Sequence, residues 1–85
     1  MESLNAFKEL GYLVQEPNKD KTYYFVNQGR KGSTTQIWVI LKKDRPVVTI
    51  KSNYQSVLLT DGGVLSNLID DFITELGYDD YDLEV

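Results

Sequence analysis

Four short segments rich in β-favouring residues follow one another in the middle of this 85-residue chain, separated only by clusters of turn-forming residues. Period-two alternation of β-branched and aromatic side chains is typical of strands with one buried face. Connections this short make consecutive strands antiparallel neighbours. The pattern therefore predicts an antiparallel meander of four strands, with expected ranges of residues 12–16, 22–27, 34–42 and 47–52.

A helix is predicted on each side of this meander. The first follows Ser3, a candidate N-cap, and the second spans residues 62–76 after Asp61, another candidate N-cap. Both helices end in the same tetrapeptide, Glu-Leu-Gly-Tyr, which places Gly11 and Gly77 just past their last turns. Gly is favoured there because it adopts the left-handed conformation without a steric penalty.

These elements predict the α+β class: a two-layer sandwich with the order αββββα and both helices on one face of the sheet. Residues 57–59 form either a fifth strand or an apolar connector. We assign residues 1–78 to a single α+β domain and residues 79–85 to an acidic C-terminal tail. The second face of the sheet is then open, and it is the first place to look for binding.

The composition excludes most small-enzyme chemistry. The chain contains no His and no Cys, which removes disulfides, thiol nucleophiles, imidazole and thiolate metal ligands, and the usual general base near neutral pH. The acidic C-terminal residues lack the twelve-residue pattern of a calcium loop. We expect no enzyme activity, no cofactor and no metal site.

The distribution of apolar residues also bears on location. The N-terminal segment has no apolar run long enough for a signal peptide, and the longest run in the chain covers only residues 37–41. Five residues cannot cross a bilayer, which takes about 20 in a helix. We therefore expect a cytoplasmic protein with no membrane partner.

The net charge of −4 conceals a strong asymmetry along the chain. Residues 1–60 hold all nine basic residues and five acids, a net charge of +4, whereas residues 61–85 hold eight acids and no base, a net charge of −8. Such asymmetry is typical of interaction segments. The plainer interpretation, which ranks somewhat above any functional one, is that these acids keep a helix and its end soluble or fold back on basic loops.

One detail argues against solubility alone. Glu75, Asp79 and Asp80 lie at or past the end of the second predicted helix, where the helix dipole disfavours anions. The last residues also alternate acids with apolar anchors, which suits docking onto a basic partner. We predict a small noncatalytic interaction or regulatory protein that binds another protein with a basic surface. The candidate partner-binding residues are Asp70, Asp71, Glu75, Asp79, Asp80, Tyr81, Asp82 and Glu84.

An alternative function is that of a module for single-stranded nucleic acid. Aromatic side chains on an open sheet stack bases, and cationic loops follow the phosphate backbone. Alternation places Tyr24 on the opposite side of its strand from Phe25. The plainer interpretation is that strands favour aromatic residues for packing and that turns carry Lys because they are exposed. The candidate residues are Tyr24, Arg30, Lys31, Trp38, Lys42 and Lys43. A further alternative is a structural homodimer formed through an exposed sheet edge.

Overall fold

The predicted antiparallel meander is present in the computed structural model of the protein, with its four strands neighbouring one another in chain order. The structure describes residues 2–17, 19, 21–28, 34–52 and 63–84. The strands are β1 (Leu13–Gln15), β2 (Thr22–Gln28), β3 (Thr34–Ile40) and β4 (Val47–Ser52). Phe25 pairs with Ile37, and Ile37 pairs with Ile50, so that these three side chains share one face of the sheet.

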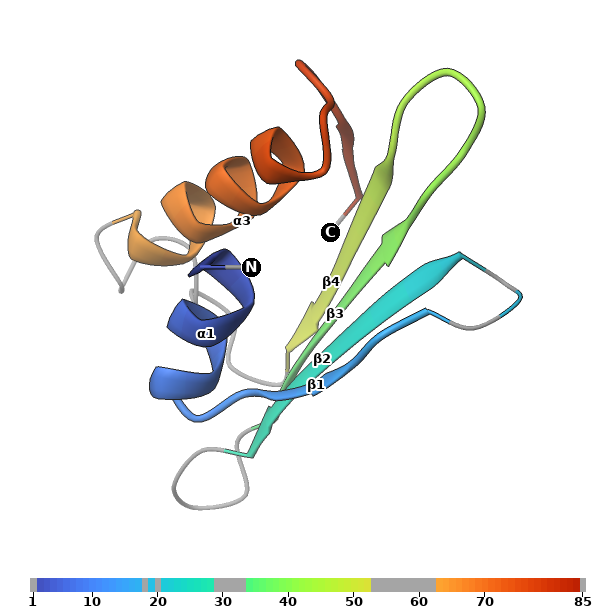
Figure 1. The fold of residues 1–85 in the computed structure, drawn as a ribbon. Helices are drawn as coiled ribbons and strands as arrows, with labels where there is room; N and C mark the ends of the chain where they lie inside the picture. Colours follow the sequence, from blue (N-terminus) through green and yellow to red (C-terminus); the bar gives the residue numbers. More distant parts are fainter. Residues whose placement is uncertain (1, 18, 20, 29–33, 53–62, 85) are drawn as a thin grey trace.

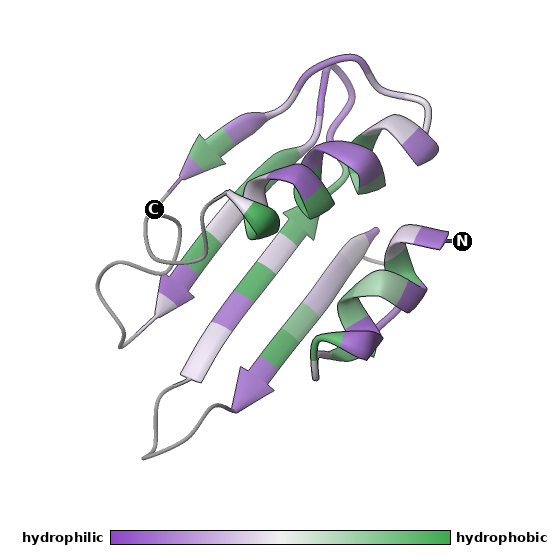
Figure 2. Ribbon diagram, turned by 90° about the vertical axis from the view of Figure 1, so that its left-hand side faces the viewer, coloured by the Kyte–Doolittle hydropathy of each residue, from purple (hydrophilic) through white to green (hydrophobic). Residues whose placement is uncertain are grey.

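Helices α1 (Glu2–Glu9) and α3 (Val64–Glu75) both pack on this face, as predicted (Figure 1). Figure 2 shows the two helices in front of the strands, along which hydrophobic and hydrophilic residues alternate. Among the described residues, no helix or strand covers the other face of the sheet. The α+β two-layer arrangement expected from the sequence is therefore confirmed.

Both helices end on the predicted Gly residues. Gly11 and Gly77 have φ angles of 98° and 94°, in the region that favours Gly. Past the end of α1, the backbone N–H of Tyr12 donates to the carbonyl oxygen of Phe7 at 3.1 Å. Past the end of α3, the N–H of Tyr78 donates in the same way to the carbonyl oxygen of Ile73 at 3.2 Å. The repeated tetrapeptide is thus one C-terminal capping geometry used twice.

The N-terminal ends of the helices differ from the prediction. Helix α1 begins at Glu2, so that Ser3 lies inside it and is not its N-cap. Helix α3 begins at Val64, two residues later than expected, with Gly63 as its N-cap. A φ of 89° at Gly63 is incompatible with a right-handed helix, which sets the boundary there. Asp61, the predicted N-cap, lies outside the described residues.

A fifth strand, β5 (Asp82–Glu84), pairs with β4 in parallel, with Leu83 opposite Val48. It lies in the segment that the sequence analysis assigns to a tail. A parallel pair requires a crossover connection, and α3 lies in the connection between these two strands. The chain therefore returns to the free edge of β4 after the helix. The alternative fifth strand, at residues 57–59, lies outside the described residues.

The core lies between the helices and the sheet. Phe7 of α1, Phe25 of β2 and Phe72 of α3 are at most 1% exposed, and their ring centroids are 4.5 to 6.4 Å apart. Each of the three elements thus contributes one ring to a common cluster, which fixes both helices on the sheet. The other buried residues of this cluster are Leu4, Tyr12, Ile37, Val39, Val48, Ile50, Leu65, Ile69 and Ile73.

Candidate functional site

The face of the sheet opposite the helices carries a row of side chains centred on two aromatic rings. Tyr24 of β2 pairs with Trp38 of β3, and Trp38 pairs with Thr49 of β4. The ring centroids of Tyr24 and Trp38 are 5.3 Å apart. Phe25, the next residue along β2, is buried in the core, so Tyr24, which alternation places on the opposite side of the strand, points away from the helices. We call this surface the open face; its central residues are Tyr24, Gln36, Trp38, Thr49 and Lys51.

Two polar side chains hold these rings in place. The Nε2 of Gln36 donates a hydrogen bond of 2.7 Å to the hydroxyl of Tyr24, and the Nζ of Lys51 lies 5.7 Å from the centroid of the Trp38 ring. A cation at this distance is attracted to the electron-rich face of the indole. Gln36 and Lys51 are absent from the predicted site. Only the pairing register, which sets Gln36 opposite Lys51, identifies them.

Cationic side chains gather at one end of the open face, where β3 turns into β4. Lys42, Lys43 and Arg45 are exposed there. They line a hollow of about 790 Å³ together with Asp82 and Glu84 of β5. Of the predicted nucleic-acid residues, the structure thus brings Tyr24 and Trp38 into contact and places two lysines at the end of their face. The other two, Arg30 and Lys31, lie outside the described residues.

The charges divide between the two layers of the molecule. Among the described residues of the range 10–52, which contains β1 to β4, six are basic and two are acidic. Helices α1 and α3 hold one base and five acids, namely Lys8, Glu2, Glu9, Asp70, Asp71 and Glu75. The asymmetry found along the sequence is therefore also a separation in space, with net positive charge on the strand layer and negative charge on the helices.

The acidic segment after α3 is fastened to the rest of the chain. The hydroxyl of Tyr81 donates a hydrogen bond of 2.6 Å to Oδ1 of Asp70. Arg45 pairs with two carboxylates, its Nη1 at 3.0 Å from Asp80 and its Nη2 at 3.1 Å from Asp82. These contacts hold the segment against α3 on one side and against the β3–β4 turn on the other. They use four of the predicted partner-binding residues, namely Asp70, Asp80, Tyr81 and Asp82.

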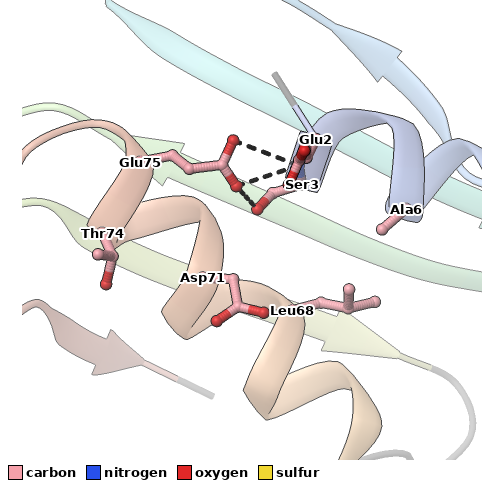
Figure 3. A pocket seen from close by; sticks show the side chains of 7 residues that line it. All are labelled: Glu2, Ser3, Ala6, Leu68, Asp71, Thr74 and Glu75. Atoms are coloured by element: carbon pink, nitrogen blue, oxygen red, sulfur yellow. Dashed lines mark hydrogen bonds between the residues drawn. The ribbon is translucent and has the colours of Figure 1, made fainter.

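Glu75 also has a partner within the chain, at the N-terminal end of α1 (Figure 3). Its carboxylate accepts hydrogen bonds from the backbone N–H of Ser3, at 3.1 Å, and from the Ser3 hydroxyl. Ser3 is buried, and the first N–H groups of a helix lack partners within the helix. Glu75 of α3 therefore accepts a hydrogen bond from an N–H group at the start of α1 that has no partner within that helix. Beside it lies a hollow of about 390 Å³, which Glu2 and Asp71 help to line.

Three predicted partner-binding residues remain exposed without such contacts. The side chains of Asp71, Asp79 and Glu84 make no hydrogen bond or ion pair with any other residue in the described parts of the chain. Asp71 lies on α3, whereas Asp79 and Glu84 belong to the C-terminal segment. Partner binding through the acidic end stays a prediction, and these three side chains are the ones most available for it.

The environment of Tyr81 predicts a stability change at high pH. Burial raises its pKa from 10 to about 12, and the hydrogen bond to Asp70 and the charges of Asp70 and Asp80 act in the same direction. The folded state therefore holds the phenolic proton more tightly than the unfolded state does. The stability that the folded state gains from this difference in pKa is fully present below pH 10 and is lost as the pH rises from 10 towards 12.

We therefore expect Tyr81→Phe to lower the free energy of unfolding by about 1 kcal/mol at pH 8, through the lost hydrogen bond. Between pH 9 and pH 11 the variant should lose less stability than the wild type, because the tyrosine that titrates is gone. Urea denaturation of wild type and variant at pH 9 and at pH 11 measures the loss of stability of each. Tyr78→Phe is the matched control, and an equal loss in wild type and Tyr81→Phe would contradict the assignment.

Comparison of the chain with protein-family models, with curated proteins and with solved structures gives no match. Neither helix in the described residues is both long and apolar enough to cross a lipid bilayer. Function follows from the chemistry of a site and not from the fold alone. The arrangement of side chains on the open face and along the acidic segment is therefore the basis for a functional inference.

Proposed function

We propose that the protein is a small noncatalytic module that binds single-stranded nucleic acid on its open face. The observation that carries this proposal is the pair of rings, Tyr24 and Trp38, which lie 5.3 Å apart on a face that no described element covers. Aromatic rings in such positions stack with bases, and every base has a flat face. Binding through stacking is accordingly tolerant of sequence.

The local charge supports this function despite the net charge of −4. Lys51 lies beside Trp38, and Lys42 and Lys43 lie at the end of the same face. Charges in solution are largely screened beyond about 8 Å at physiological ionic strength. A phosphate backbone on the open face is thus affected mainly by the positive strand layer, and less by the acids of α3 on the other layer.

A titration with a labelled oligothymidine of about twelve nucleotides, a length within the range of known single-strand sites, tests the proposal. Trp38 is the only tryptophan of the chain, so quenching of its fluorescence reports contact at the open face directly. We expect quenching together with increased anisotropy of the label. If three lysines neutralise phosphates, log Kobs should fall with log salt at a slope of about −2. No change in either signal at 50 mM salt would refute the proposal.

Binding of a cationic protein segment is the second candidate function. It is favoured by the exposure of Asp71, Asp79 and Glu84 and by the bond from Tyr81 to Asp70, which brings the acids of α3 and of the C-terminal segment together. Capture of a lysine-rich peptide, with no oligonucleotide binding, would favour this function over the first. A mass of two chains by light scattering would favour the homodimer instead.

A further inference from the structure

Arg45 holds two carboxylates in the way that arginine holds a phosphate. Two separate N–H groups of its planar guanidinium face Asp80 and Asp82, at 3.0 and 3.1 Å. The N–H groups of an arginine guanidinium also donate hydrogen bonds to phosphate oxygens. The side chains of Arg45, Asp80 and Asp82 are 50%, 70% and 51% exposed, and ion pairs this exposed are weak and sensitive to salt. An incoming phosphate can therefore replace the two carboxylates.

The position of Arg45 places this exchange at the proposed binding surface. Arg45 lines the hollow at the end of the open face together with Lys42, Lys43 and Asp82. In the described parts of the chain neither lysine has an acidic partner within 4 Å, whereas Arg45 has two. In the described residues, a phosphate backbone that reaches this turn therefore meets Lys42 and Lys43, which have no acidic partner, and Arg45, which is already paired with the C-terminal segment.

The same segment also places an anion at the end of the aromatic row. Glu84 lies in register with Thr49, which pairs with Trp38. The attachment of β5 is slight, since it pairs with β4 over three residues and all three are exposed. The ion pairs of Arg45 therefore act together with the short backbone pairing of β5 and the hydrogen bond of Tyr81 to Asp70 in keeping Glu84 beside the open face.

We infer that the C-terminal segment is an intramolecular competitor of the ligand, in which Asp80 and Asp82 occupy the phosphate-binding position of Arg45. The inference rests on the proposed function and adds regulation to it. With the segment docked, the open face binds single strands weakly. With Arg45 released, one more cation contacts phosphate and the negative charge of β5 is no longer held beside the stacking rings.

The experiment compares two double variants with the same change of charge, using the oligothymidine titration. Asp80→Asn with Asp82→Asn releases Arg45, whereas Asp71→Asn with Asp79→Asn removes two acids that have no partner in the described residues. We expect the first variant to bind about five- to tenfold more tightly than the second at 50 mM salt, with a salt slope steeper by about 0.7. Adding Arg45→Gln to the first variant should abolish that gain.

The outcomes separate the inference from the function on which it rests. Equal gains in the two double variants would overturn the inference and leave the proposed function standing, because only overall charge would matter. Weak binding by the wild type, with a clearly larger gain in the Asp80→Asn, Asp82→Asn variant than in the Asp71→Asn, Asp79→Asn variant, would support the inference. Binding by neither variant nor the wild type, with native circular dichroism in all three, would overturn both.

Discussion

Replacing Phe72 with alanine should lower the free energy of unfolding by about 3 to 5 kcal/mol. The Phe72 side chain is fully buried, and its ring lies 4.9 Å from that of Tyr23 and 5.4 Å from that of Phe25. It is also the ring of α3 that contacts Phe7 of α1. Alanine would leave a cavity where both helices meet the sheet. The surrounding rings belong to two other elements, α1 and β2, and can only partly refill it.

A domain of this size has a total stability of about 4 to 13 kcal/mol, so this loss would leave much of the variant unfolded. Urea denaturation, followed by circular dichroism and by the fluorescence of Trp38, measures the change. Val64→Ala is the matched control on the same helix, because Val64 is 48% exposed and its loss should cost less than about 0.5 kcal/mol. A cost below 1 kcal/mol for Phe72→Ala would show that the three rings do not form the centre of the core.

The main layers of this fold could be predicted because their signals are local. Apolar residues of the second helix such as Phe72 recur at helical spacing. Phe25 and Ile37 lie in segments of β-favouring residues whose side chains alternate between the two faces, and Gly11 and Gly77 mark the helix ends. Each of these patterns reports which way a side chain points relative to its own backbone. The class and the order of the first four strands follow from them.

Strand β5 could not be predicted, because nothing local specifies it. Its three residues, Asp82–Glu84, have low strand propensity apart from Leu83 and are all exposed. They pair with β4 because α3 brings the chain back to that edge and because Arg45, far away in sequence, neutralises the acids. The bond of Glu75 to Ser3 spans 72 positions and is equally invisible to sequence patterns.

The open face could be predicted from the sequence only in part. Alternation places Tyr24 on the opposite side of its strand from Phe25, but the contact between Tyr24 and Trp38 depends on the register of two strands. The same register sets Lys51 beside Trp38, which no property of Lys51 itself indicates. Residue type and alternation identify the candidates for a surface site, and only the pairing of strands shows which of them meet.

Trp38→Ala should weaken binding of the oligothymidine by about five- to 150-fold, because stacking of one base on an aromatic ring contributes about 1 to 3 kcal/mol. Tyr24→Ala should produce a smaller loss, since the phenol offers less area than the indole. Anisotropy of the labelled oligonucleotide measures the affinity of both variants, because Trp38→Ala lacks the tryptophan whose fluorescence reports binding in the wild type. Trp38→Phe keeps a flat ring and should recover most of the affinity, whereas loss of a merely structural residue would not be repaired in this way.

The matched control is Leu13→Ala, at the β1 edge of the open face. Leu13 is 74% exposed and pairs with Val26, which alternates with Phe25 and so points to the same side as Tyr24. If stacking is the source of affinity, Leu13→Ala should change binding less than about twofold. If the open face instead buries apolar area against a second chain, Leu13→Ala and Trp38→Ala should both shift the molecular mass towards one chain. Unchanged oligonucleotide affinity in Trp38→Ala, with the fold intact, would exclude the open face as a stacking surface.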